Sequence, residues 1–306
     1  MSLQKKPRRA LNGILLLDKP LELTSNAALQ IVKRLFNAEK AGHTGSLDPL
    51  ASGMLPICFG QTTKFSQFLL EANKTYEVTA RLGQKTTTGD AEGEIIADNP
   101  VPEFSMDVLN EACMSFRGLI SQVPSMYSAL KVNGQVLYKL ARKGITIERP
   151  SRQVTIEVLE ILDYANYELK MRISCSKGTY IRTLVEDLGD KLGCGAYVSQ
   201  LRRSSIAGLS ELKMYDLPTL ENLEMDQLDA CLIDLSTALQ GFPIVILQRT
   251  AAHYLQQGQA VSLPTVLGQQ KWVQMYYNDQ FFGMGEVQPD GRIAPSRLLR
   301  AKSLVA

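Results

Sequence analysis

Residues 42–53 read Gly-His-Thr-Gly-Ser-Leu-Asp-Pro-Leu-Ala-Ser-Gly, and they contain a single carboxylate, Asp48. No other acidic residue occurs between Glu39 and Glu71. Four glycines and two prolines between residues 42 and 64 let the backbone turn sharply, approach a ligand closely or hold a fixed φ. We therefore predict that residues 42–64 form a loop that presents the Asp48 side chain. A structural alternative is that Asp48 only caps a turn before Pro49.

The chain before this loop predicts a strand followed by a helix. Residues 14–17 are apolar and indicate a buried strand. Thr24 and Ser25 can cap a helix whose apolar residues recur at helical spacing, namely Ala28, Ile31, Val32 and Leu35. Lys33 and Arg34 lie on the polar side of this helix. Side chains at such positions face solvent more often than they contact phosphate.

The chain after the loop predicts a sheet with one face exposed to water. Strands are predicted over residues 76–82, 154–161 and 167–175, and apolar and polar residues alternate in the first and third of these. Such alternation is typical of an antiparallel sheet. Helices are predicted over residues 65–69 and 108–116, and residues 83–94 are expected to form a polar loop.

Arg182 is a candidate functional residue because it conflicts with its local setting. The turn at residues 176–179 leads into a predicted helix that ends near Gly193 and has an apolar face comprising Ile181, Leu184, Val185, Leu188 and Leu192. A cation in the first turn of a helix opposes the helix dipole. Arg182 is therefore expected to fix a carboxylate, the alternative being an exposed salt bridge.

Charge is distributed unevenly along a chain whose net charge is only +2. Residues 131–152 contain six basic residues and one acid, whereas residues 211–234 contain seven acids and one basic residue. Residues 122–152 are rich in Gly, Pro and Tyr, and we interpret them as an insertion that lies over the substrate. The basic segment fits a nucleic-acid footprint, and the alternative for it is a solvated charged face. Residues 208–238 are predicted to be helical. Beyond residue 241, short strand-like segments and one short helix indicate a small β-rich module.

The overall composition is that expected of an ordinary soluble globular protein of the cytoplasm. A chain of 306 residues with 45% hydrophobic content can bury a sizeable core. Five scattered cysteines contain no Cys-x-x-Cys pair, and the only imidazoles belong to His43 and His253, so no disulfide framework and no metal site are expected. No apolar run approaches the length of a membrane helix, so no contact with a membrane is expected.

The residues around Asp48 resemble the catalytic motif of the TruB-type tRNA pseudouridine synthases, and further matching segments follow in the family's order. These are residues 12–20, 74–76, 122–131, 175–182 and 201–203. The resemblance implies an α+β fold: a mixed, mainly antiparallel sheet with flanking helices and a substrate-covering insertion, plus a small β-rich C-terminal PUA-like module. It also implies a catalytic domain over residues 1–240, with an RNA-contacting insertion at 122–152, and an RNA-binding module over residues 241–306. A packing appendage is the alternative for that module.

The resemblance assigns Asp48 as the nucleophile and Arg182 as the guanidinium that holds it. It places Tyr76 against the target base and near its C5 atom, while Tyr180 and Leu201 complete the pocket wall. In this interpretation His43 fills the space left by a flipped-out base or contacts the flipped nucleotide, and Lys64 contacts phosphate. Isomerising uridine to pseudouridine requires no redox cofactor and no metal. Attack at C6, attack at C1′ and elimination with Asp48 as a base all remain open.

The implied substrate is the T-loop of tRNA, at the uridine of position 55, and the expected partner is therefore the T-stem-loop. The length of the insertions favours an enzyme that finds tRNA by itself, without a guide RNA, and no protein partner is predicted. Two other functions fit the residues. An RNA-folding chaperone would not need Asp48, and a hydrolytic nucleosidase or glycosidase would use it but lacks a convincing paired acid.

Overall fold

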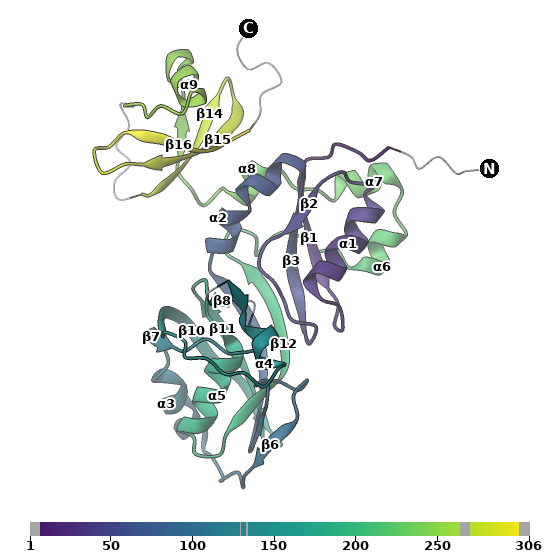
Figure 1. The fold of residues 1–306 in the computed structure, drawn as a ribbon, viewed down its shortest axis with the longest axis vertical. Coiled ribbons are helices and arrows are strands. Elements are labelled where there is room, and N and C mark those ends of the chain that lie inside the picture. Colours follow the sequence, from purple (N-terminus) through teal and green to yellow (C-terminus); the bar gives the residue numbers. More distant parts are fainter. Residues whose placement is uncertain (1–6, 129, 133, 264–269, 300–306) are drawn as a thin grey trace, which may run out of the picture.

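The computed structural model describes residues 7–128, 130–132, 134–263 and 270–299. The outer ends of the two predicted domains, and residues 129 and 133 of the predicted insertion, lie outside the described residues. Most of the chain before residue 207 is built around one mixed sheet, and a smaller sheet lies at the C-terminal end (Figure 1). No helix among the described ranges is long and apolar enough to cross a membrane.

The main sheet confirms the predicted α+β class. Its strands follow the order β1 (Gly13–Lys19), β3 (Ala51–Phe59), β12 (Ala196–Ile206), β4 (Lys74–Leu82), β11 (Glu168–Cys175), β10 (Arg152–Ala165) and β7 (Gly118–Gln122). The short strand β2 (Ala41–His43) also pairs with β3. Every neighbouring pair is antiparallel except β3 and β12, which are parallel over three residues. The sheet is thus mixed and mainly antiparallel.

Alternation along β4 places its apolar residues on the face covered by helices. Val78, Ala80 and Leu82 are buried in one core cluster with the apolar side of α5 (Ile181–Lys191) and with α3 (Met106–Met114). Glu77, which alternates with them, is exposed on the opposite face. The expectation of one face exposed to water is therefore confirmed for this half of the sheet.

The other half of the sheet is covered by α1 (Ser25–Leu35), which begins at the predicted cap. The Thr24 side chain accepts a hydrogen bond from the backbone N–H of Ala27. Ala28 and Val32 are fully buried against β1 and β3. Ala51 of β3 belongs to this cluster and pairs with Leu201 of β12, which contacts both clusters, so α1 and α5 cover the same face of the sheet.

The prediction of a loop over residues 42–64 was wrong for most of that stretch. It contains β3, the end of β2, and most of the 3-10 helix η1 (Gly60–Phe65), which leads into α2 (Ser66–Glu71). Pro56 is tolerated because it faces Leu16 at a position without mutual hydrogen bonds: the Leu16 carbonyl accepts from Tyr215 and the Pro56 carbonyl accepts from Thr44. Gly53 has φ +99°, and a Cβ there would lie 2.2 Å from the Arg203 carbonyl oxygen.

Residues 83–94 and the insertion form small hairpins beside the sheet. β5 (Gln84–Thr86) pairs with β6 (Ile95–Asp98). The polar loop predicted over residues 83–94 is therefore confirmed only for residues 87–94, because its first residues form β5. In the insertion, β8 (Lys131–Val132) and β9 (Gln135–Val136) precede α4 (Leu137–Ala141).

Residues 208–238 form three short helices, whereas a predominantly helical segment was predicted. These are α6 (Leu217–Glu221), α7 (Met225–Ala230) and α8 (Leu235–Ala238). The acidic residues Asp216, Glu224 and Asp234 occupy the N-cap positions, so they begin new helices and do not extend one.

The C-terminal module is a β-rich unit, as predicted. Its sheet has the order β13 (Ile244–Ile246), β14 (Trp272–Tyr277), β15 (Gln280–Val287) and β16 (Ile293–Leu298), and it carries α9 (Arg249–Gln256). Aromatic contacts join it to the start of α2, with ring centroids 5.3 Å apart for Phe68 and Trp272 and 5.7 Å apart for Phe65 and Phe281. Figure 1 shows the module at one end of the molecule, next to α2.

Candidate active site

Asp48 lies in the turn between β2 and β3, and the start of α1 holds that turn in place. The Ser25 hydroxyl accepts from the Leu47 backbone N–H at 2.7 Å and donates to the Leu47 carbonyl at 2.9 Å. On the other side, the backbone N–H of Glu22 donates to the Pro49 carbonyl at 2.8 Å. The residues flanking Asp48 are therefore both fixed by contacts with the N-terminal segment.

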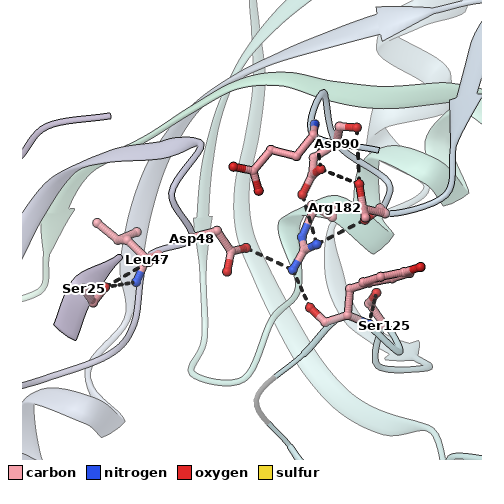
Figure 2. Close-up of polar contacts among 9 residues, drawn as sticks. Ser25, Leu47, Asp48, Asp90, Ser125 and Arg182 are labelled. Atoms are coloured by element: carbon pink, nitrogen blue, oxygen red, sulfur yellow. Dashed lines mark hydrogen bonds and ion pairs between the residues drawn. The ribbon is translucent and has the colours of Figure 1, made fainter. Parts of the chain in front are cut away.

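Arg182 contacts Asp48 directly. The Nη2 atom of Arg182 lies 2.9 Å from Oδ2 of Asp48, and Figure 2 shows the two side chains pointing toward each other. The Arg182 side chain is 10% exposed, whereas the Asp48 side chain is 47% exposed. A buried guanidinium thus holds in place a carboxylate that stays open to a substrate.

Asp90 is the second carboxylate on Arg182, and the sequence reasoning missed it. Its Oδ2 atom lies 3.0 Å from Nη1 of Arg182, and its side chain is only 2% exposed. The Thr88 hydroxyl and the backbone N–H of Glu92 also donate to Asp90. These bonds satisfy a carboxylate that would otherwise be costly to bury. Its only sequence signal was an Asp after Gly89 in a Thr-rich turn, which we interpreted as an ordinary polar loop.

Backbone carbonyls complete the surroundings of Arg182. Nη1 also donates to the Thr88 carbonyl at 3.1 Å, and Nη2 donates to the Tyr127 carbonyl at 2.8 Å. Figure 2 shows these contacts converging on the guanidinium from separate segments. Arg182 therefore joins the Asp48 turn, the loop between β5 and β6 and the predicted insertion.

Tyr76 lies on β4, opposite Arg203 of β12, and it packs against both core clusters of the main sheet. Burial raises the pKa of the Tyr76 phenol, and the Arg203 guanidinium offsets this only in part, so the phenol is protonated at neutral pH. Arg203 is 1% exposed and donates to the carbonyls of Met54 at 2.7 Å and Gly45 at 3.0 Å. Arg203 thus supports both Tyr76 and the segment before Asp48.

Tyr180 immediately precedes α5 and is held by Gln122, a buried residue whose role the sequence did not reveal. The Tyr180 backbone N–H donates to Oε1 of Gln122 at 2.8 Å, and Nε2 of Gln122 donates to the Tyr180 carbonyl at 3.0 Å. Arg152 covers the ring, with its Cζ atom 5.0 Å from the ring centroid. The position of Tyr180 is therefore fixed on both sides.

The other three predicted residues occupy different places around the main sheet. Leu201 is half-buried in β12 between Ala51 and Val78. His43 lies on β2; its pKa is lowered by burial and by the Arg203 charge, and its buried Nδ1 atom has no hydrogen-bond partner among the described residues. Lys64 lies in η1, where its ammonium group donates to Oε1 of Gln61 at 3.2 Å.

Lys19 is a further buried charge near Asp48 that was not predicted. Its ammonium group donates to the carbonyls of Pro20 at 2.7 Å and Leu23 at 2.6 Å. Burial lowers its pKa to about 8, against the opposing effects of Asp48 and Glu92. Lys19 thereby fixes the segment whose Glu22 N–H supports the Asp48 turn.

A cleft of about 580 Å³ opens beside the Asp48 turn, between Pro49, Leu50 and Leu201. Its strand residues also include Glu77, Thr79 and Lys170, which lie on the sheet face opposite α5. This cleft is therefore adjacent to Asp48 without containing it.

The arrangement suits nucleophilic or basic chemistry by Asp48. Asp48 is accessible and paired with a cation, whereas Asp90 is buried and occupied by Arg182. Asp90 is thus poorly placed to serve as the general acid that a paired-carboxylate glycosidase requires.

Comparison with known proteins identifies matches over nearly the whole chain. A family model described as the N-terminal domain of the TruB family of pseudouridylate synthases matches residues 33–181. Models described as the C-terminal domain of tRNA pseudouridylate synthase B and as the C-terminal part of pseudouridine synthase II TruB match residues 182–240 and 243–299.

Curated proteins with similar sequences share about half of their residues with this chain. A protein of Coxiella burnetii named tRNA pseudouridine synthase B is 52% identical over 300 residues, covering 96% of this chain and 97% of that protein. A protein of Pseudomonas putida with the same name is 51% identical and covers 99% of this chain and 100% of that protein.

Solved structures with the same fold are more distant in sequence. A chain from a Cbf5-Nop10-Gar1 complex aligns with a TM-score of 0.73 at 24% identity, covering 94% of this chain and 84% of that chain. A chain from an H/ACA RNP bound to a substrate RNA containing 2′-deoxyuridine aligns with a TM-score of 0.71 at 21% identity, covering 95% and 86%. These likenesses support the fold.

Proposed function

Because the chain belongs to the TruB family of pseudouridylate synthases, we propose that it converts uridine to pseudouridine at position 55 in the T-loop of tRNA, with Asp48 as the nucleophile. The observation that carries the residue assignment is the contact between buried Arg182 and half-exposed Asp48. It holds a carboxylate at an accessible position, which the proposed reaction requires.

The isomerisation breaks the C1′–N1 bond, forms a C1′–C5 bond and removes the proton from C5, while N1 gains a proton. The atoms balance without an oxidant, a reductant or a metal. Asp48 can attack C6 of the base, attack C1′ of the ribose, or act as a base in an elimination through a glycal. Each route needs the Asp48 carboxylate in a fixed position, which its contact with Arg182 provides.

The neighbouring side chains suit the retention of a detached base. In the proposal, Tyr76 stacks on the base near C5, and Tyr180 and Leu201 form the wall of the pocket. The neutral imidazole of His43 contacts the flipped nucleotide or fills the space that it leaves, and Lys64 contacts a phosphate. Asp90 acts as a positioning residue because it holds Arg182 from the buried side.

The proposed division of labour follows the chain. Residues 1–240 form the catalytic domain, residues 122–152 contact the RNA, and residues 241–306 form a PUA-like RNA-binding module. We propose that the enzyme acts alone, because its half-identical curated relatives carry the name of a tRNA enzyme. Its five free cysteines suit the reducing cytoplasm.

The test is tritium release from an unmodified tRNA transcript labelled at C5 of uridine, in buffer with chelator and without guide RNA. The proposal predicts release by the wild-type protein and a single pseudouridine at position 55 when the product is mapped. Binding of tRNA without release would favour the RNA chaperone, and free uracil would indicate a hydrolase. Release only after a guide RNA is added would refute the stand-alone enzyme.

A further inference from the structure

A second concave site lies at the far end of α1 from Asp48. It has a volume of about 520 Å³ and is lined by Arg8, Lys33, Arg34, Asn37 and Met225, together with Gln30 and Leu35. Figure 1 shows α1 beside α6 and α7 in this part of the molecule. Three cations and no acid contribute to its lining, so the site has a cationic surface.

None of Arg8, Lys33 and Arg34 forms an ion pair with a carboxylate in the part of the chain that the structure describes, whereas the adjacent Arg9 pairs with Asp229. Lys33 and Arg34 also gain from the dipole at the C-terminal end of α1. That effect does not account for Arg8, which comes from a separate segment and lines the same hollow.

The position of the site relates it to the proposed active site. α1 starts at Ser25, which holds the residue before Asp48, and its 11 residues span about 16 Å. α1 and α5 cover the same face of the main sheet, so the cationic hollow opens on the helix-bearing side of the protein. An RNA whose target uridine lies at Asp48 would need to extend over α1 to reach it.

We infer that this hollow binds the phosphodiester backbone of tRNA at a point outside the T-arm. The inference rests on the proposed function and adds a contact to the body of the substrate. Phosphate is the recognised chemistry because the side chains offer guanidinium and ammonium groups and an amide, all of which donate to phosphate oxygens. α1, which is about 16 Å long, runs from the Asp48 turn to the hollow, so a phosphate bound beside Lys33 and Arg34 lies away from the target nucleotide.

The test compares two RNAs and matched charge reversals. The wild-type protein and the variants Arg34→Glu and Arg8→Glu are compared. For each protein, RNA affinity and pseudouridine formation are measured with full-length tRNA and with an isolated T-arm hairpin. Lys191→Glu is the control, because Lys191 is also an exposed cation in the last turn of a helix and lies on α5, outside the hollow. Thermal unfolding of each variant establishes that it is folded.

The inference predicts that Arg34→Glu and Arg8→Glu weaken binding of full-length tRNA about tenfold and reduce its salt slope by about one. Turnover of the hairpin and the Lys191→Glu control stay at wild-type levels. Unchanged tRNA affinity would overturn the inference, and so would an equal loss with both RNAs. Inorganic phosphate that binds in the hollow at millimolar concentration and is not displaced by tRNA would also overturn it. Failure of the wild-type protein to modify either RNA would instead refute the proposed function.

Discussion

Replacing Asp90 by Asn tests whether the buried side of Arg182 matters for catalysis. The change keeps the size of the side chain and an oxygen that can accept hydrogen bonds from Thr88 and from the Glu92 N–H. It removes the charge that lies 3.0 Å from Nη1 of Arg182. It also presents an amide NH₂ group to the guanidinium if the side chain rotates.

The expected magnitude follows from the remaining partners of Arg182. Breaking a buried ion pair completely costs about 3–5 kcal/mol. Arg182 keeps Asp48 and the carbonyls of Thr88 and Tyr127, so the loss should be closer to that of one charged hydrogen bond, about 1.5–3 kcal/mol. If that loss falls on the positioning of Asp48 in the transition state, kcat decreases by about 10-fold to 150-fold.

The assay is single-turnover tritium release from labelled tRNA, with tRNA affinity and urea unfolding measured on the same samples. Asp98→Asn is the matched control, because Asp98 is an exposed residue of β6 on the same hairpin. The control should keep wild-type values of kcat, affinity and stability. Asp90→Asn should lower kcat and leave the Kd for tRNA within about threefold of wild type.

A wild-type kcat for Asp90→Asn would refute this reasoning, provided that the protein is folded at the assay temperature. A loss confined to tRNA affinity would also contradict it, because Asp90 is buried and has no access to RNA.

Three further predictions concern the support of the site and the core. Gln122→Ala removes both hydrogen bonds to the Tyr180 backbone, so urea unfolding should show that the free energy of unfolding falls by roughly 1–3 kcal/mol, and turnover should be slower. Unchanged stability and turnover would show that Gln122 does not hold Tyr180. Gly53→Ala forces a Cβ against the Arg203 carbonyl. Gly118 also has a positive φ, but a Cβ there would meet no atom within 4 Å, so Gly53→Ala should destabilise the protein by several kcal/mol more than Gly118→Ala. Equal losses of stability for the two variants would contradict the clash. Burial raises the pKa of the Cys58 thiol from its ordinary value of 9.0 to about 12, so it should resist a thiol reagent at pH 8 until the protein unfolds. The Cys58 thiol ionises at a lower pH in the unfolded protein than in the folded protein. The contribution of Cys58 to the free energy of unfolding should therefore fall as pH rises from about 9 toward 12, and a Cys58→Ala variant should lose less stability over that range.

Periodicity was enough to predict the elements whose burial is one-sided. β4 and β11 alternate apolar and polar residues, and α5 has an apolar stripe, because each packs one face on a core.

The central strands β3 and β12 were not predicted from their sequences. β3 contains Gly53 and Pro56, which usually punctuate loops, and β12 ends in a polar run that includes the buried Arg203. Both strands are stabilised by pairing with segments distant in sequence: β3 with β1, and β12 with β4. Local propensity does not contain that information.

The residues of the proposed active site were also predicted only in part from the sequence. Asp48 stood out because it is isolated among turn-forming residues, and Arg182 stood out because it conflicts with the dipole of its own helix. Asp90 and Gln122 gave little local signal, since an Asp in a turn and a Gln at a strand end are ordinary. Their roles arise from contacts 92 and 58 residues away, which only the folded chain reveals.

The most direct test of the account is the rate of tritium release by Asp48→Asn, measured under single-turnover conditions beside the wild type, with tRNA affinity determined in parallel. We expect no detectable release by the variant and a Kd for tRNA close to that of wild type. Release by Asp48→Asn at a rate comparable to wild type would contradict the assignment of Asp48 as the reacting carboxylate.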